Sequence, residues 1–77
     1  MATVRCKMRC FTVARCVDWS GNAYAKVELS AVTGGSDENI EFYHSTPHGR
    51  FEAQIVSAAA NAFEPGKEYY VDFTPAS

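Results

Sequence analysis

The sequence predicts an all-β domain of about five antiparallel strands, in a small barrel or sandwich, with one short helical segment before the last strand. Three observations lead to this prediction. Several stretches alternate apolar and polar residues with a period of two, which is typical of half-buried strands. Clusters of Gly, Pro, Asn, Asp and Ser separate these stretches and indicate turns. Only the stretch 57–63 is alanine-rich enough to favour a helix. The 77 residues suit one domain, 1–77.

The first strand is expected to start at residue 3, and its character extends to Val17. Apolar and basic side chains alternate between residues 3 and 10. One face of this strand carries Val4, Cys6, Met8 and Cys10, and the other carries Arg5, Lys7 and Arg9. The phase then changes, because Phe11 and Val13 fall on the basic face. This change predicts a bulge, a bend or a new strand partner near 10–12.

The segment 18–22 has the residue types that turns select, so it predicts a hairpin between the first strand and a second strand at 23–32. Val27 and Leu29 belong to the apolar face of the second strand, and Lys26 and Glu28 to its polar face. The hairpin is expected to place the basic residues of the first strand beside glutamate, which is a favourable cross-strand arrangement.

The rest of the chain supplies three more strands and the helical segment. The expected elements are a loop at 33–39, a third strand at 40–44, a loop at 45–49, a fourth strand at 50–56, the helical segment at 57–63, a turn at 64–67 and the last strand at 68–74. In the last strand Tyr69, Val71 and Phe73 share one face. An OB-like barrel stays open as an alternative, although the helix of that fold usually lies elsewhere in the strand order.

Charge is unevenly distributed along the chain. The net charge is −2, yet residues 1–15 carry four basic residues and no acid. The overall balance does not favour a general nucleic-acid role. A local basic strip of Arg5, Lys7 and Arg9, with Phe11 on the same face, nevertheless resembles surfaces that bind single strands by charge and stacking. A second interpretation is that these basic residues protect a strand edge from aggregation.

Ten aromatic rings are more than a core of this size usually absorbs. Some of them are therefore expected at the surface, where exposed rings often mark contacts. The candidates for an interaction surface are Trp19, Tyr24, Tyr43 and Tyr70. The alternative is that the tyrosines lie at the edge of the core with wet hydroxyls. Small size and surplus rings together predict a homo-oligomer.

No motif indicates catalysis, a metal or a cofactor. The three cysteines are an odd number, and Cys6 and Cys10 are too far apart on an extended strand to form a disulfide. His44 and His48 have a spacing seen in zinc fingers, but Pro47 breaks the helix that a finger needs. The carboxylates are scattered over loops and polar faces. We therefore expect a protein without enzymatic activity, in a reducing compartment and outside membranes.

The segment 63–75, Phe-Glu-Pro-Gly-Lys-Glu-Tyr-Tyr-Val-Asp-Phe-Thr-Pro, resembles the ending of a family of small, largely uncharacterised bacteriophage β proteins. Residues 27–32, followed by Gly-Gly-Ser-Asp-Glu-Asn, and the run 45–52 are similar to the same family. The likeness extends from about residue 3 to residue 75. The shared motifs belong to turns and strands, so the resemblance implies a fold and no catalytic residues.

The resemblance implies a location in the host cytoplasm, with incorporation in the virion as a further expectation. It leaves three roles open. The first is a virion component, such as a capsid decoration or stabilising protein. The second is an intracellular inhibitor of a host defence or host enzyme, which acts by binding a protein or a nucleotide. The third is an accessory protein that binds single-stranded nucleic acid. The partner is thus the chain itself, a phage or host protein, or nucleic acid.

Overall fold

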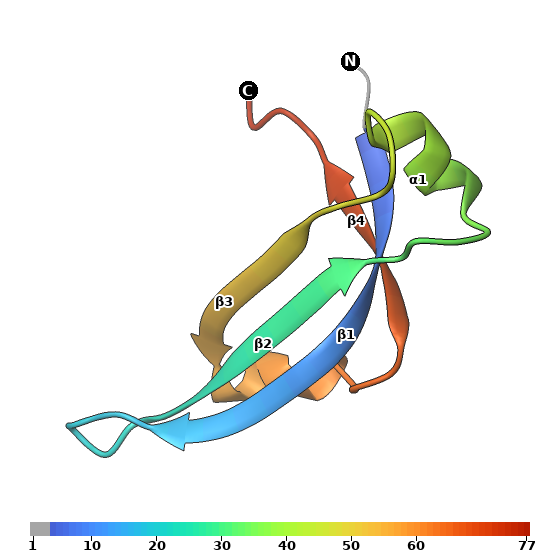
Figure 1. The fold of residues 1–77 in the computed structure, drawn as a ribbon. Coiled ribbons are helices and arrows are strands. Elements are labelled where there is room, and N and C mark those ends of the chain that lie inside the picture. The colour runs from blue at the N-terminus through green and yellow to red at the C-terminus, as the bar shows by residue number, and fades with distance from the viewer. Residues whose placement is uncertain (1–3) are drawn as a thin grey trace.

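A computed structural model describes residues 4–77 of the chain (Figure 1). In chain order the elements are β1 (Val4–Val17), β2 (Ala23–Ala31), α1 (Asp37–Phe42), β3 (Arg50–Val56), the 3₁₀ helix η1 (Ser57–Ala62) and β4 (Glu68–Phe73). The structure confirms the mostly β class and the short helical segment before the last strand. It contains four strands, where the sequence predicted about five.

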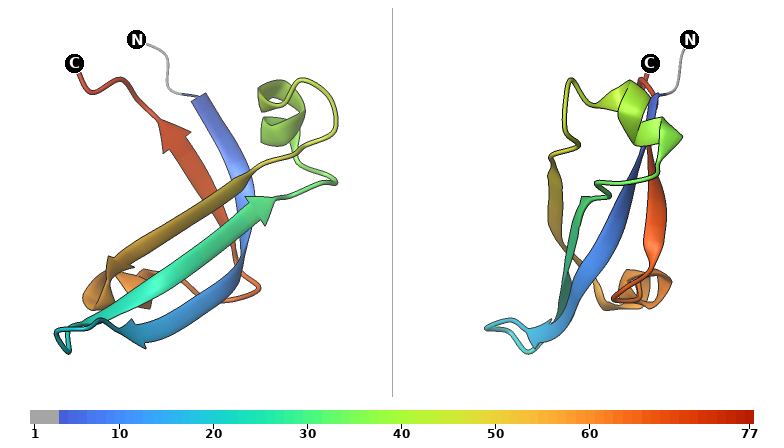
Figure 2. Two further views of the ribbon diagram at one scale, coloured as in Figure 1. Left: turned by 60° about the vertical axis from the view of Figure 1, so that its left-hand side comes forward. Right: turned by 45° about the vertical axis from the view of Figure 1, so that its right-hand side comes forward.

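The strands form one antiparallel sheet in the order β3-β2-β1-β4. β1 pairs with two strands. Its residues 8–17 pair with β2, and its residues 4–9 pair with β4. The sheet twists along β1, so β4 runs at a steep angle to β2 and β3 (Figure 2). Among residues 4–77 no ladder joins β3 to β4, and the sheet is open. The predicted barrel is therefore wrong. The predicted sandwich is also wrong, because the strands form a single sheet. The loss of one expected strand leaves too few to complete a closed sheet.

The predicted irregularity near 10–12 is a β-bulge. The ladder between β1 and β2 skips Phe11, which lies between the paired residues Cys10 and Thr12. A bulge inserts one extra residue and so restores the alternation after it. Val13 consequently lies opposite Val27 and packs against the core, so its expected place on the basic face is wrong.

The expected third strand at 40–44 is wrong, because the chain forms α1 there. The helix starts after Ser36, whose hydroxyl accepts a hydrogen bond of 3.4 Å from the backbone N–H of Asn39. Two acids follow in the first turn, where they interact favourably with the helix dipole. Five residues are too few to distinguish a strand from a short helix. The serine with its two acids was the signal that identifies the helix.

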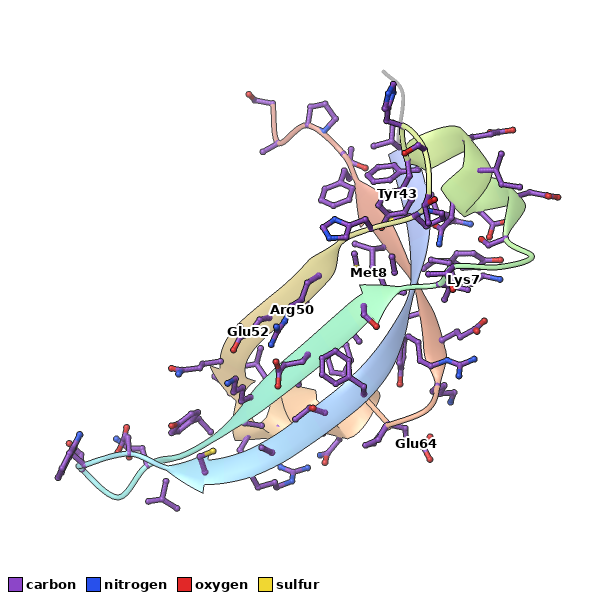
Figure 3. All side chains as sticks on the ribbon, viewed as in Figure 1. Lys7, Met8, Tyr43, Arg50, Glu52 and Glu64 are labelled. Carbon is purple, nitrogen blue, oxygen red and sulfur yellow. The ribbon has the colours of Figure 1, made fainter. Side chains whose placement is uncertain are left out.

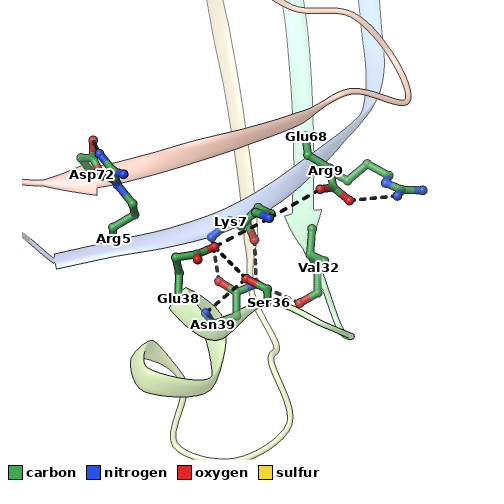
Figure 4. A network of polar contacts seen from close by, with 9 residues as sticks. All are labelled: Arg5, Lys7, Arg9, Val32, Ser36, Glu38, Asn39, Glu68 and Asp72. Carbon is green, nitrogen blue, oxygen red and sulfur yellow. Dashed lines mark hydrogen bonds and ion pairs between the residues drawn. The ribbon is translucent and has the colours of Figure 1, made fainter.

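Asn39 takes the place of a strand residue beside β1. Its side chain is fully buried, and its Oδ1 accepts a hydrogen bond of 2.6 Å from the backbone N–H of Lys7. Its Nδ2 donates to the carbonyl oxygens of Lys7 and Val32, each at 2.8 Å (Figure 4). A carboxamide offers the donor and acceptor of a peptide group. Asn39 therefore extends the hydrogen-bonded ladder beyond the end of β2.

The turns join the strands as the sequence predicts. In the hairpin between β1 and β2, the Asp18 carboxylate accepts hydrogen bonds from the backbone N–H groups of Ser20 and Asn22, at 2.9 Å and 2.8 Å. The turn before β4 contains Gly66 with a φ of 92°. L-residues other than glycine rarely adopt this conformation, so glycine is needed at this position.

The core is small and lies on one face of the sheet. Its buried apolar residues, among those described, are Cys6, Met8, Cys10, Ala25, Val27, Leu29 and Ala60. η1 covers this face at the end formed by β2 and β3 (Figures 1 and 2). Arg15 holds η1 in place by donating to the Ser57 hydroxyl at 3.0 Å and to Asn61 Oδ1 at 2.9 Å. The cysteines are free thiols, as the spacing on β1 predicted for Cys6 and Cys10.

Candidate protein-binding face

The core face of the sheet is hollowed between β3 and β4, above the buried residues of β1 and β2. A groove of about 330 Å³ lies there, which we call the β3–β4 groove. Its lining residues are Leu29, Phe51, Phe63, Tyr69, Tyr70, Val71 and Asp72. The rings of Phe63 and Tyr69 pack with their centroids 5.4 Å apart. The Tyr69 hydroxyl donates to the carbonyl oxygen of Ala62 at 3.0 Å, which ties β4 to the end of η1. The groove is thus preformed and mostly apolar.

A second apolar patch, the Phe42–Phe73 patch, borders the far end of β4. It consists of Val4, Phe42 and Phe73, each between 39% and 51% exposed. The rings of Phe42 and Phe73 stack with their centroids 6.1 Å apart. Phe73 shares its face of β4 with the groove residues Tyr69 and Val71, since residues two apart on a strand point the same way. The groove and the patch therefore lie along one strand.

The molecule exposes more surface than a compact monomer of its size. Its accessible surface is 5525 Å², whereas a compact chain of this mass exposes about 4,700 Å². Its radius of gyration is 14.4 Å, against about 11.5 Å for a compact chain of this length. The excess surface is about 800 Å², as expected for an elongated molecule with extents of 43 × 32 × 17 Å.

The predicted basic strip is neutralised by acidic residues (Figure 4). Arg5 binds Asp72 of β4 through two hydrogen bonds, at 2.6 Å and 3.1 Å. Arg9 pairs with Glu68 of β4 at 3.0 Å. Lys7 Nζ lies 3.7 Å from a carboxylate oxygen of Glu38 in α1 and 3.9 Å from one of Glu68. The strip lies on the face opposite the core, as its alternation predicted, but its surface carries mixed charge.

The acidic partners come from β4 and α1, and not from β2 as the hairpin led us to expect. Arg9 lies opposite Ser30, and Glu28 binds Arg50 of β3 instead. The hydrogen bond from the Arg5 guanidinium lowers the pKa of Asp72, because it stabilises the charged carboxylate. The pairing of β4 with β1 joins residues far apart in sequence, and no local pattern specifies it.

Nucleic-acid binding through the strip stays a prediction that the geometry supports weakly. Phe11 is half exposed at the bulge, where the Arg50 guanidinium carbon lies 5.9 Å from its ring centroid. Because the strip's basic side chains already have acidic partners, we expect no binding of single-stranded DNA at low salt. Fluorescence anisotropy with a labelled oligonucleotide measures this directly. Binding that weakens steeply with salt, and that replacement of Arg5, Lys7 and Arg9 by Gln abolishes, would contradict the expectation.

The four candidate aromatic residues do not form one surface. Trp19 is fully exposed at the tip of the β1–β2 hairpin. Tyr70 is 54% exposed on the outer face of β4, with the Arg5 guanidinium carbon 4.5 Å from its ring centroid. Tyr24 is half-buried on β2. Tyr43 packs against the core. The rings that do gather on the core face are those of Phe51, Phe63 and Tyr69 in the β3–β4 groove and those of Phe42 and Phe73 in the patch.

Tyr43 is a packing residue with a buried hydroxyl. It lies near Met8 (Figure 3), and among the described residues its hydroxyl makes no regular hydrogen bond and has only the weakly bonding Cys6 thiol beside it. Burial raises the pKa of Tyr43, because the charged form loses its water. An unpaired buried hydroxyl also costs free energy.

We expect Tyr43→Phe to stabilise the protein by about 1 kcal/mol, because it removes the unpaired hydroxyl and keeps the ring. Urea denaturation measures the free energy of unfolding. The matched control is Tyr69→Phe, whose hydroxyl bonds to Ala62 and Glu64, and which should destabilise by a similar amount. A loss of stability in Tyr43→Phe would mean that the hydroxyl has a partner.

Residues 4–77 offer neither a metal site nor a membrane-spanning helix. No three His, Cys, Asp or Glu side chains gather closely enough to hold a metal ion within that range. The helices α1 and η1 are both too short to cross a membrane, and the described residues contain no longer one. His44 and His48 are exposed. The β3–β4 groove and the Phe42–Phe73 patch therefore make the best supported binding surface.

The sequence suggested part of this surface. The alternation at 68–74 placed Tyr69, Val71 and Phe73 on one face, and the surplus of rings indicated an exposed apolar contact. Comparison with models of protein families, with curated proteins and with solved structures found no match to this chain.

Proposed function

We propose that the chain is a non-enzymatic interaction module that works by binding protein, in the first place a second copy of itself. The observation that carries this proposal is the exposed apolar surface along β4, which consists of the β3–β4 groove and the Phe42–Phe73 patch. Exposed apolar patches of this kind mark protein contacts.

The place of this module is proposed from the resemblance of 63–75 to small phage proteins. We infer a virion component, such as a capsid decoration or stabilising protein, made in the host cytoplasm. A structural role suits an open β domain, because a particle offers many copies and many shape-fitted contacts. The alternative role, an intracellular inhibitor of a host defence or host enzyme, uses the same surface on a different partner.

Mass spectrometry of purified particles of the phage that encodes the chain distinguishes these roles. We expect the chain in many copies per particle. Its absence from the particle would overturn the virion role and favour the intracellular one. In that case the partner is sought in lysate of infected cells, with a groove variant such as Phe51→Asp as the control.

A further inference from the structure

β4 is an edge strand whose protection against pairing is limited to two acids, Glu68 and Asp72. Its outer side has no neighbouring strand among residues 4–77. Natural edge strands usually carry Lys, Pro or a bulge that prevents pairing with another chain. The segment Glu68–Phe73 contains none of these, and its ladder to β1 is regular.

The backbone of β4 shows which groups face outward. The N–H of Cys10 donates to the carbonyl oxygen of Lys67 at 2.9 Å, so residue 67 faces β1. Backbone groups alternate in direction along an antiparallel strand. Tyr69 and Val71 therefore face β1 as well, while the N–H and C=O groups of Tyr70 and Asp72 point to the open edge. These groups could bond to another strand.

Only one register lets two β4 strands pair well. If Val71 of one copy lies opposite Val71 of the other, Tyr70 lies opposite Asp72 of the second copy and each offers its outward N–H and C=O. Tyr69 then lies opposite Phe73 on the apolar face. Shifting the register by two residues in either direction sets two acids opposite each other, either Glu68 and Asp72 or two copies of Asp72. Like charges directly opposite are destabilising.

The distribution of apolar surface favours β4 over β3 as the strand that pairs with a second copy. Both the β3–β4 groove and the Phe42–Phe73 patch border β4, whereas β3 borders only the groove. Pairing of two β4 strands joins the two grooves into one continuous apolar floor, so the facing rings can bury one another.

From these observations we propose that two copies pair through β4 in antiparallel fashion, about a two-fold axis at Val71, to form one continuous eight-stranded sheet. Each copy contributes its sheet of four strands. The proposal deepens the proposed function, on which it rests, by naming the strand, the register and the partner. A two-fold dimer is also the commonest form of protein self-association.

Disulfide trapping tests the register. In a background with Cys16→Ser, the variants Tyr70→Cys and Asp72→Cys are made separately and oxidised gently, alone and as a mixture. A hydrogen-bonded pair has Cα atoms about 5.5 Å apart, which suits a disulfide. We expect cross-linked dimers in the mixture only. Cross-linking of Tyr70→Cys alone would place residue 70 opposite itself and overturn the register, and no cross-link in any sample would overturn the proposal.

A pair of proline variants tests the edge. Tyr70→Pro removes an outward N–H from β4, and Gln54→Pro is the matched change on the edge strand β3. We expect Tyr70→Pro to raise the dimer dissociation constant by roughly tenfold or more, and Gln54→Pro to leave it within about twofold. The reverse result would overturn the proposal in favour of β3. Circular dichroism confirms folding, and the trapping experiment decides if either variant unfolds.

The two proposals fail separately. Many copies in the particle without the cross-link would retain the virion role and reject the β4 pairing. The cross-link without copies in the particle would retain the pairing and reject the virion role.

Discussion

Asn39→Asp should destabilise the protein by about 3 kcal/mol or more at neutral pH, which is the largest effect that we expect from a single substitution. The change keeps the shape of the side chain but replaces the Nδ2 donor with an oxygen. In the unmodified protein Nδ2 donates to the carbonyl oxygens of Lys7 and Val32, each at 2.8 Å. In the variant an oxygen takes its place and faces these two carbonyl oxygens. The site is fully buried, so water cannot compensate.

The pH dependence of Asn39→Asp has a definite sign. Burial beside two carbonyl oxygens raises the pKa of the introduced carboxyl in the folded state, because it disfavours the charged form. The penalty is therefore smallest below the pKa of the unfolded chain, about 4, and grows as the pH rises through the folded value. Urea denaturation at pH 4 and pH 7 measures the difference from the unmodified protein.

The control for Asn39→Asp is Asn22→Asp, the same chemical change at an exposed turn position. It should alter the free energy of unfolding by no more than about 0.5 kcal/mol. A comparably small effect in Asn39→Asp would show that the side chain does not extend the ladder of β1.

Val27→Ala should destabilise the protein by about 2 kcal/mol, because it removes two methyl groups from the centre of the core and leaves a cavity. Val27 is fully buried, lies between β1 and β3 in the sheet, and faces Val13 and Ala53 on the neighbouring strands. A chain this short has a total stability of only about 5 kcal/mol, so the loss is a large fraction of it.

Val56→Ala provides the matched control, because Val56 is 70% exposed on β3. The same loss of two methyl groups should cost no more than about 0.5 kcal/mol there. Thermal and urea denaturation of both variants give the comparison. Equal effects at the two positions would mean that Val27 is not at the centre of the core.

The sequence was sufficient for the local elements whose signal is repeated or chemically specific. The alternation predicted a strand, which the structure confirms from Val4 onward, while residue 3 lies outside the described residues. The phase change at Phe11 predicted an irregularity, which is a bulge, and Pro65 with Gly66 predicted the last turn. The helix α1 was not predicted, because the short stretch 40–44 is rich in strand-forming residues, whereas the signal for a helix, Ser36 with two acids, lies before it.

The pairing of strands that lie far apart in the sequence could not be predicted from local patterns. The acids that neutralise Arg5 and Arg9 lie in β4, more than 55 residues away along the chain. Their pairing depends on how β1 divides itself between two strands, and no residue of β1 encodes that division alone. For the same reason the sequence could not show that the sheet stays open or that Asn39 completes the ladder of β1.

The mass of the unmodified protein in solution tests the central claim, that an open sheet is completed by a second copy. Light scattering during gel filtration over a range of concentrations measures it without a variant or a probe. We expect twice the chain mass of 8.5 kDa, with dissociation on dilution. A single chain mass at the highest soluble concentration would contradict self-association and leave the open face to a different protein.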